Sequence, residues 1–345
     1  MALIPCTPHW RPGAVLDTTP AIEVCRDVLY HPLTDQQLDV DPLWGVYDAA
    51  GALVDAAAYY RGPGSIPVGQ SALRDWPTSV AVADHEVLLY GGVIVDHFGH
   101  FLLTSLARLW PLLPPSADRG SLRILFHGMG DPDQWWAVPY VAACFAALGL
   151  ARGNLAWFPG PTRIPYLVVP RPAFEEHNFI HAEYVALTRA IGARLASPPA
   201  ARRGPVYLAR TRYAKITQGF VNEQALVDRL AAVGVTIVHA EDLTLAEHIA
   251  LFDAASVVFG PISSTFHPAV FARAPCPLML LSPTHIVNPN FGMLDAAAGL
   301  PAEYYFVDPE RLPDDPSGRV THRYVIRDVD ALTRDIVGRL RSLLG

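Results

Sequence analysis

Cysteines are few in this sequence, and their spacing excludes several kinds of site. The chain contains four: Cys6, Cys25, Cys144 and Cys276. No two of them form a C-x-x-C pair. A disulfide framework and a cysteine zinc site both depend on such clusters, so we expect buried thiols in a reducing compartment.

Charge and long hydrophobic runs are also scarce. Charged residues make up 17% of the sequence, and the formal net charge is −7. Nucleic-acid binders are usually basic, so we expect no nucleic-acid partner. No run reaches the roughly 18 apolar residues that a membrane-spanning helix needs. The first residues also lack the basic and apolar segments of a secretory signal. These features predict a cytoplasmic protein, for which peripheral contact with the inner membrane stays open.

Hydrophobic residues make up 51% of the sequence, which is sufficient for two cores. At roughly 150 residues per domain, the chain length predicts two domains. The segment most typical of a linker is SPPAARRGP at residues 197–205. We therefore expect an N-terminal domain over residues 1–200 and a C-terminal domain over residues 201–345.

The first half of the chain is predicted to be α/β. Short apolar runs between Pro, Gly and Asp residues favour strands up to residue 95, and the run 88–95 is the clearest. From Phe101, apolar residues recur at helical spacing until Pro111. Further segments are expected as follows: strands at 52–60, 122–127, 155–158 and 166–169, and helices at 135–148 and 177–196.

The alternation of strands and helices is clearest over residues 206–272. Strands are predicted at 206–210, 235–239 and 256–259, with helices at 222–233 and 243–254 and a polar loop at 211–219. One more strand, at 277–281, and a terminal helix, at 328–344, extend the pattern. This alternation predicts a parallel sheet, whose ligand crevice lies beyond the carboxyl ends of the strands.

Residues just past two of these strand ends favour a phosphorylated ligand. Guanidinium groups pair with phosphate, and small residues allow backbone N–H groups to approach it. The other interpretations are solvated surface arginines, a plain turn, and a histidine that caps its helix. The candidate donor-binding residues are Arg210, Arg212, Lys215, Ser263, Ser264, Thr265 and His267.

Three ionisable residues precede the helix predicted from Phe101: Asp96, His97 and His100. An imidazole has a suitable pKa to accept a proton from a hydroxyl group. Asp96 could itself be the base or could orient a histidine. These three are the candidate catalytic residues, and the choice among them stays open, as does a structural role.

Two acidic clusters are weaker candidates for a metal site. The sequence Asp131-Pro132-Asp133 has the D-x-D pattern of some metal sites, but carboxylates are also favoured at the start of a helix. We interpret it as a turn into a helix. The cluster Glu175-Glu176-His177 is too short to indicate a metal site, and none is predicted.

Two segments resemble glycosyltransferase family 61. The sequence GHFLLTSLARLW at residues 99–110 is similar to the family's G-H-F signature, with Thr104 where an acidic residue is common. The second segment includes YLAR at 207–210 and AEDLTLAEHI at 240–249. Its loop from Gly260 to Pro268 lacks the first His and the Asn of the family's G-x-H-G-A-x-L-x-N pattern. Order and spacing agree over roughly residues 90–285.

The resemblance implies a GT-B-like α/β protein with two Rossmann-like domains facing a cleft. It implies an inverting hexosyl- or pentosyltransferase that moves a sugar from a nucleotide-sugar donor to a glycan or lipid-linked acceptor. Neither a cofactor nor a bound metal is implied. The setting would be bacterial capsular or surface polysaccharide synthesis.

Two alternatives stay open. One is a catalytically silent protein that binds a nucleotide sugar. The other is a different nucleotide-dependent α/β enzyme, such as a dehydrogenase or a kinase. Against the second, the sequence has no G-x-G-x-x-G after a strand and no G-x-x-x-x-G-K-[ST].

Overall fold

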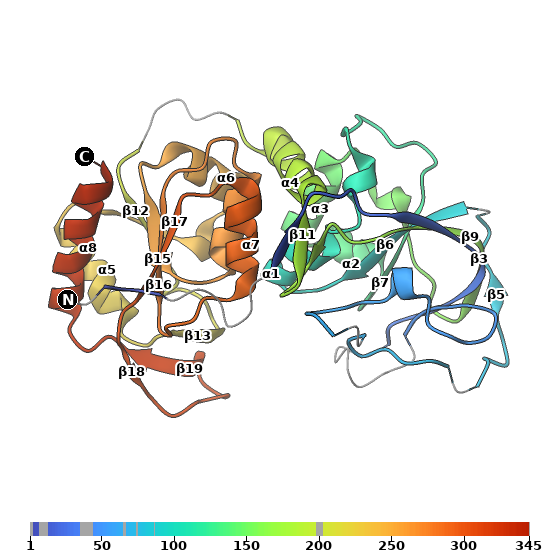
Figure 1. Ribbon diagram of the computed structural model, residues 1–345, viewed down its shortest axis with the longest axis horizontal. Helices are drawn as coiled ribbons and strands as arrows, with labels where there is room; N and C mark the ends of the chain where they lie inside the picture. Colours follow the sequence, from blue (N-terminus) through green and yellow to red (C-terminus); the bar gives the residue numbers. More distant parts are fainter. Residues whose placement is uncertain are drawn as a thin grey trace. The chain divides into compact units, whose positions relative to one another are not determined.

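The computed structural model describes residues 3–6, 13–34, 44–64, 67–73, 75–85, 87–197 and 203–344 (Figure 1). The chain divides into two compact units, and each is described by itself. The first spans residues 13–194, and the second combines residues 195–345 with residues 1–12. Of the predicted linker, residues 198–202 lie outside the described part. Among the cysteines, Cys144 and Cys276 are buried as expected, whereas Cys6 and Cys25 are half-buried.

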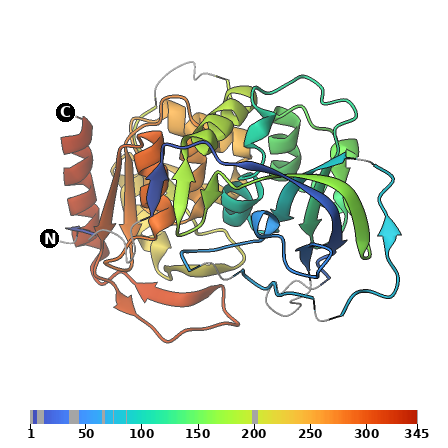
Figure 2. The same cartoon turned by 45° about the vertical axis from the view of Figure 1, so that its right-hand side comes forward.

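A mixed sheet forms the centre of the first unit, in the order β4-β3-β9-β6-β7-β8, with β5 also paired to β9. Strands β9, β6, β7 and β8 are parallel, and β3 and β4 add antiparallel pairs. The long strands β3 and β9 lie side by side (Figure 2). The strands are β3 (Ile22–His31), β4 (Gly45–Tyr47), β5 (Ala81–Val82), β6 (Val87–Ile94), β7 (Ile124–Gly128), β8 (Leu155–Ala156) and β9 (Thr162–Pro170).

Helices α2 (Pro132–Trp136), α3 (Pro139–Ala147) and α4 (Ala182–Leu195) complete this unit. A single helix was expected at 135–148, but the chain breaks before Pro139, which has no N–H group to continue the ladder. Asp131 caps α2 and forms a capping box with Gln134, which confirms the predicted turn into a helix. The strand expected at 52–60 is wrong, because these residues form a short 3₁₀ turn, η1 (Asp55–Ala57).

A small second sheet joins β10 (Phe174–Glu175), β11 (Phe179–His181) and β2 (Ala14–Leu16). It lies next to the helical segment that was predicted to run from Phe101. That segment is shorter than expected: α1 (Phe98–His100) continues into one π-helical turn, η2 (Phe101–Ser105), and a separate 3₁₀ turn, η3 (Trp110–Leu112), follows.

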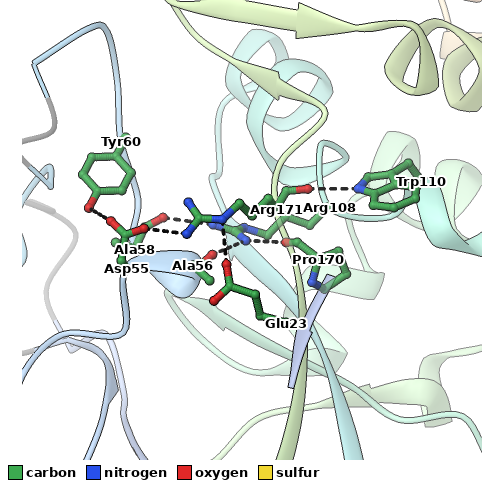
Figure 3. A network of polar contacts seen from close by, with 9 residues as sticks. All are labelled: Glu23, Asp55, Ala56, Ala58, Tyr60, Arg108, Trp110, Pro170 and Arg171. Atoms are coloured by element: carbon green, nitrogen blue, oxygen red, sulfur yellow. Dashed lines mark hydrogen bonds and ion pairs between the residues drawn. The ribbon is translucent and has the colours of Figure 1, made fainter. Parts of the chain in front are cut away.

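The helix ends early because tertiary hydrogen bonds hold the residues after it. The buried guanidinium of Arg108 donates to the carbonyl oxygens of Ala56 (2.7 Å), Ala58 (2.9 Å) and Pro170 (2.5 Å), as Figure 3 shows. The indole N–H of Trp110 donates to the carbonyl of Arg171 at 2.9 Å. Arg108 therefore fastens the η1 turn to the end of β9.

The second unit contains a doubly wound sheet in the order β1-β17-β16-β15-β12-β14. Numbered along the chain, its five parallel strands have the order 2-1-3-4-5, with β1 antiparallel at the edge. The strands are β12 (Val206–Ala209), β14 (Thr236–His239), β15 (Val258–Pro261), β16 (Leu278–Ser282), β17 (Ala302–Phe306) and β1 (Ile4–Pro5).

Helices cover both faces of this sheet. Helices α5 (Glu223–Ala232) and α8 (Val329–Leu344) lie on one face, and α6 (Leu245–Ala254) and α7 (Pro289–Ala298) on the other (Figure 1). Leu226, Ile336 and Leu340 pack against Tyr207 and Phe259 in the core. The predicted capping box of Thr244 and Glu247 at the start of α6 is confirmed.

Two features of this unit were not expected. Strand β13 (Ile216–Phe220) overlaps the segment predicted as a loop at 211–219, and it pairs with β19 (Val320–Val325), next to β18 (Glu310–Arg311). Strand β1 pairs with β17, so residues 3–6 belong to this unit, whereas residues 1–200 were expected to form one domain. The open edge of a sheet has unpaired backbone groups that can pair with any nearby strand. Sequence composition does not reveal which strand that will be.

Replacement of Arg108 should destabilise the first unit. In Arg108→Met, three buried carbonyls lose their donors, so we expect the free energy of unfolding to fall by about 3–5 kcal/mol. Thermal and urea unfolding would measure the loss. The control is Arg229→Met, because Arg229 forms an exposed ion pair with Asp330 and its loss should cost about 0–1 kcal/mol. Equal effects of the two substitutions would contradict the structural role of Arg108.

Candidate functional site

In the second unit, the strand order reverses between β12 and β15. Both neighbours of β12, β14 and β15, are parallel to it, and a ligand crevice in such sheets lies beyond the carboxyl ends at this point. Arg210 follows β12 directly, and Ser263 to Thr265 follow β15. Two groups of candidate residues that lie about fifty positions apart in the sequence are therefore brought to the same edge.

Gly260 allows these two strands to lie close together. A Cβ atom at this position would be 2.6 Å from the carbonyl oxygen of Leu208, too close for any side chain without a shift of the backbone. The short distance between β12 and β15, which carry the candidate site, therefore requires glycine at position 260.

The side chain of Arg210 turns inward and is mostly buried. Its Nη1 donates to the carbonyl of Gln218 at 3.2 Å, and its guanidinium lies 5.8 Å from the ring centre of Tyr213. The buried Nε finds no acceptor among the described residues. Burial lowers the pKa of Arg210, and Glu223 partly offsets this. A buried guanidinium with an unused donor is suited to an anionic ligand.

Glu223 is a residue of this site to which the sequence analysis assigned no role. Its carboxylate is buried and accepts hydrogen bonds from the backbone N–H of Arg210 (2.9 Å) and the hydroxyl of Tyr207 (3.3 Å). Burial raises the pKa of Glu223, and these hydrogen bonds oppose the rise. Glu223 lies in the first turn of α5, directly after Asn222. No local sequence pattern there predicts a contact with the end of β12.

The other two basic candidates lie on the surface. Arg212 forms an ion pair with Asp242, and both side chains are more than half exposed. Lys215 is exposed, just before β13. Exposed pairs of this kind exchange partners at little cost, so Arg212 can release Asp242 for a phosphate.

The loop after β15 contains both exposed and buried candidates. The hydroxyl of Ser263 contacts that of Thr265 at 2.7 Å and donates to the carbonyl of Pro261 at 3.2 Å. Ser264 is partly exposed at the start of a 3₁₀ segment, η6 (Ser264–Phe271). Thr265 and His267 are buried, and the ring of His267 lies 4.9 Å from that of Phe291 in α7. The two serines are therefore the accessible members of the group.

In the first unit, His97 precedes α1 and His100 is its last residue, with ring centres 4.9 Å apart. Asp96 is exposed and forms no hydrogen bond or ion pair within the described part of the chain. It therefore makes no hydrogen bond to either histidine, although its charge acts on His97. His100 is partly exposed and hydrogen-bonded, which distinguishes it from its two neighbours.

The hydrogen-bond partner of His100 is Glu176, which the sequence analysis did not select. The carboxylate of Glu176 receives hydrogen bonds from His100 Nδ1 (2.7 Å), Thr104 Oγ1 (2.8 Å) and Arg61 Nη2 (3.2 Å). Burial would raise the pKa of Glu176, but the hydrogen bonds and positive charges of its partners lower it to about 2. The family resemblance suggests an acidic residue at position 104. The residue there is a threonine, and it is hydrogen-bonded to the carboxylate of Glu176, which lies elsewhere in the chain.

A cavity of about 30 Å³ is lined by Thr104 and Glu176 together with Tyr59, Tyr90 and Trp44. Because about 10–15 Å³ of such volume holds one water molecule, this cavity has room for about two. Among the described residues, no group of three or more His, Cys, Asp and Glu side chains is arranged to hold a metal ion. Asp133, of the D-x-D sequence, is paired with Arg152.

Together these features define an α/β protein with basic and hydroxyl side chains at the strand-order reversal of one unit and a histidine paired with a carboxylate in the other. The chain belongs to glycosyltransferase family 61, whose model matches residues 98–279. The matched segment includes His100, Glu176, Arg210 and Ser264. A search of curated proteins found no match. Membership of the family implies glycosyltransferase activity, with a nucleotide sugar as donor and a glycan as acceptor. None of the described helices is long and apolar enough to cross a membrane.

The close approach of β12 and β15 generates a prediction about Gly260. We expect Gly260→Ala to push the strands apart and to lower the free energy of unfolding by about 1–3 kcal/mol. The control is Gly338→Ala in α8, where a new Cβ meets nothing within 4 Å and should be neutral or stabilising. Thermal unfolding of both variants is the measurement. An unchanged melting temperature for Gly260→Ala would show that the strands are less constrained than described.

The charge of Glu176 generates a pH-dependent prediction. Its folded pKa of about 2 lies below the ordinary value of 4.5, so between these values the unfolded chain binds a proton that the folded protein does not. The contribution of Glu176 to stability is therefore complete above about pH 4.5 and declines as the pH falls towards 2. We expect the melting-temperature difference between wild type and Glu176→Gln to shrink over this range. A pH-independent difference would contradict this, and Glu310→Gln, at an exposed position, is the control.

Proposed function

We propose that the protein is an inverting glycosyltransferase of the GT-B class. The second unit binds the nucleotide-sugar donor, and the first supplies the acceptor side and the base. The observation that carries this proposal is the placement of Arg210 and the Ser263–Thr265 loop at the strand-order reversal between β12 and β15. Ligands of open α/β sheets bind at this position, and family membership identifies the ligand class as a nucleotide sugar.

The proposed chemistry is a direct displacement at the anomeric carbon. The acceptor hydroxyl attacks, the bond to the diphosphate oxygen breaks, and Arg210 and Arg212 offset the charge on the departing diphosphate. The hydroxyls and N–H groups of Ser263, Ser264 and Thr265 bind phosphate or ribose, near Lys215 and His267. Among Asp96, His97 and His100, we propose His100 as the base because it alone has a hydrogen-bonded carboxylate partner.

The proposed setting is bacterial capsular or surface polysaccharide synthesis in the cytoplasm, where the enzyme contacts the inner membrane peripherally. The transferred group is a hexosyl or pentosyl sugar, and the acceptor is a glycan or lipid-linked glycan. Neither a metal nor a cofactor takes part in this scheme. A second candidate is a protein that binds the nucleotide sugar without transferring it, and the loop from Gly260 to Pro268, which lacks the first His and the Asn of the family pattern, favours it.

A thermal-shift screen with UDP, GDP, CMP and dTDP and their sugar conjugates, with and without EDTA, would test the proposal. A ligand at 100 times its Kd stabilises by about 2.7 kcal/mol, which such a screen detects. We expect a shift with one nucleotide series that is indifferent to EDTA and is lost in Arg210→Ala. The control is Arg229→Ala, which removes an exposed ion pair between α5 and α8.

Three outcomes separate the candidates. Binding together with slow hydrolysis of the sugar nucleotide supports a transferase. Binding without transfer or hydrolysis favours the silent binding protein. A shift only with NAD or ATP would overturn the assignment of a nucleotide-sugar ligand.

A further inference from the structure

We propose that Glu176 is a positioning residue for His100: its carboxylate holds the imidazole with Nδ1–H directed inward and Nε2 outward, as the atom that accepts a proton. This inference rests on the proposed function for its chemistry. The hydrogen bond between Glu176 and His100 is present whatever the protein catalyses. The positioning role and the proposed function can therefore be tested separately.

The two partners differ strongly in burial. The side chain of Glu176 is 2% exposed, whereas that of His100 is 31% exposed, and 2.7 Å separate Glu176 Oε1 from His100 Nδ1. An ionised carboxylate accepts hydrogen bonds only, so the proton in this bond belongs to Nδ1. The neutral ring then has its lone pair on Nε2, which lies on the opposite side of the imidazole.

Glu176 is itself held in place by its other hydrogen-bond donors. Thr104 donates to the same oxygen as His100, and Arg61 binds the other. The charge of Arg61 and these hydrogen bonds keep the carboxylate ionised despite its burial. His97 and His177 also lie within electrostatic reach of Glu176 and His100. A carboxylate with three donors has little freedom to rotate away from the histidine.

The backbone is constrained on both sides of this pair. Glu176 begins the three-residue loop between β10 and β11, in which His177 adopts a left-handed conformation with φ of +63°. The hairpin is tied to the segment that carries His100, because Ala173 N–H donates to the carbonyl of Ala107 at 2.8 Å. The buried hydroxyl of Tyr184 in α4 donates to the carbonyl of Leu102 at 2.7 Å.

The proton and electron pairs balance in the resulting step. The acceptor hydroxyl gives its proton to Nε2 of His100 while its oxygen forms the bond to the anomeric carbon. The bond from that carbon to the diphosphate oxygen breaks, and its electron pair leaves with the diphosphate. The imidazolium that forms is stabilised by the Glu176 carboxylate, and its new proton passes to solvent afterwards.

The experiment combines a spectroscopic and a kinetic readout on the full-length chain. Long-range ¹H–¹⁵N NMR of protein labelled at histidine, at pH 8 and without ligand, reports the tautomer of each ring. Assignment uses His100→Gln. We expect His100 to be the Nδ1–H tautomer in wild type, and to shift towards the Nε2–H tautomer in Glu176→Gln. Glu175→Gln is the matched control, because Glu175 neighbours Glu176 in the same hairpin and instead receives a hydrogen bond from Asn178.

The kinetic readout is hydrolysis of UDP-, GDP-, CMP- and dTDP-sugars, measured in wild type and the same variants. We expect Glu176→Gln to lower kcat by about 10²–10⁴-fold with little change in KM, because the ring then presents the wrong nitrogen. Glu176→Asp, which keeps the charge, should recover part of this loss. The Glu175→Gln variant should retain wild-type kcat.

The outcomes distinguish this inference from the proposed function. An Nε2–H tautomer for His100 in wild type, or no change in Glu176→Gln, would overturn the role of Glu176. A kcat unaffected by Glu176→Gln in an active enzyme would overturn it too. If wild type hydrolyses no sugar nucleotide but the tautomer changes as expected, the positioning role is supported and the transferase proposal fails.

Discussion

The hydrogen bonds of Arg108 are the constraint on which the first unit most depends. One buried guanidinium binds the carbonyls of Ala56, Ala58 and Pro170, which belong to a turn and a strand far apart in the sequence. Without these acceptors, a buried charge would be strongly destabilising, so the segments and the arginine stabilise one another.

Buried carboxylates have a similar function in both units. Glu176 accepts three hydrogen bonds around His100, and Glu223 accepts the backbone N–H of Arg210. Each is buried, and each contacts a segment that the proposed reaction requires. A carboxylate buried with its hydrogen bonds satisfied fixes the direction of its partners more strictly than an exposed one, because misalignment leaves a charge without compensation. The two contacts therefore set the orientation of the proposed base and of the backbone at a strand end.

Much of the second unit could be predicted from the sequence. The hydrophobic period of residues 206–272 placed β12, β14 and β15 and the helices between them within a few residues of their observed bounds. That period is a local property, and the apolar face it defines has to be buried whatever the rest of the chain does. The proximity of Arg210 to the Ser263–Thr265 loop then follows from the parallel order of the strands. Local signals also located the capped helix starts at Asp131 and Thr244.

By itself, the sequence determined the α/β class, the strand ends that carry the donor candidates, and membership of glycosyltransferase family 61. Only the tertiary structure decided that Glu176, and not Asp96, is the partner of His100, because 76 residues separate the two and no spacing rule connects them. It likewise decided the burial of His267, the pairing of Arg212 with Asp242, and the early end of the helix after His100. Side-chain hydrogen bonds and ion pairs between distant segments depend on how the elements pack, whereas strands and helices depend mainly on the residues within them.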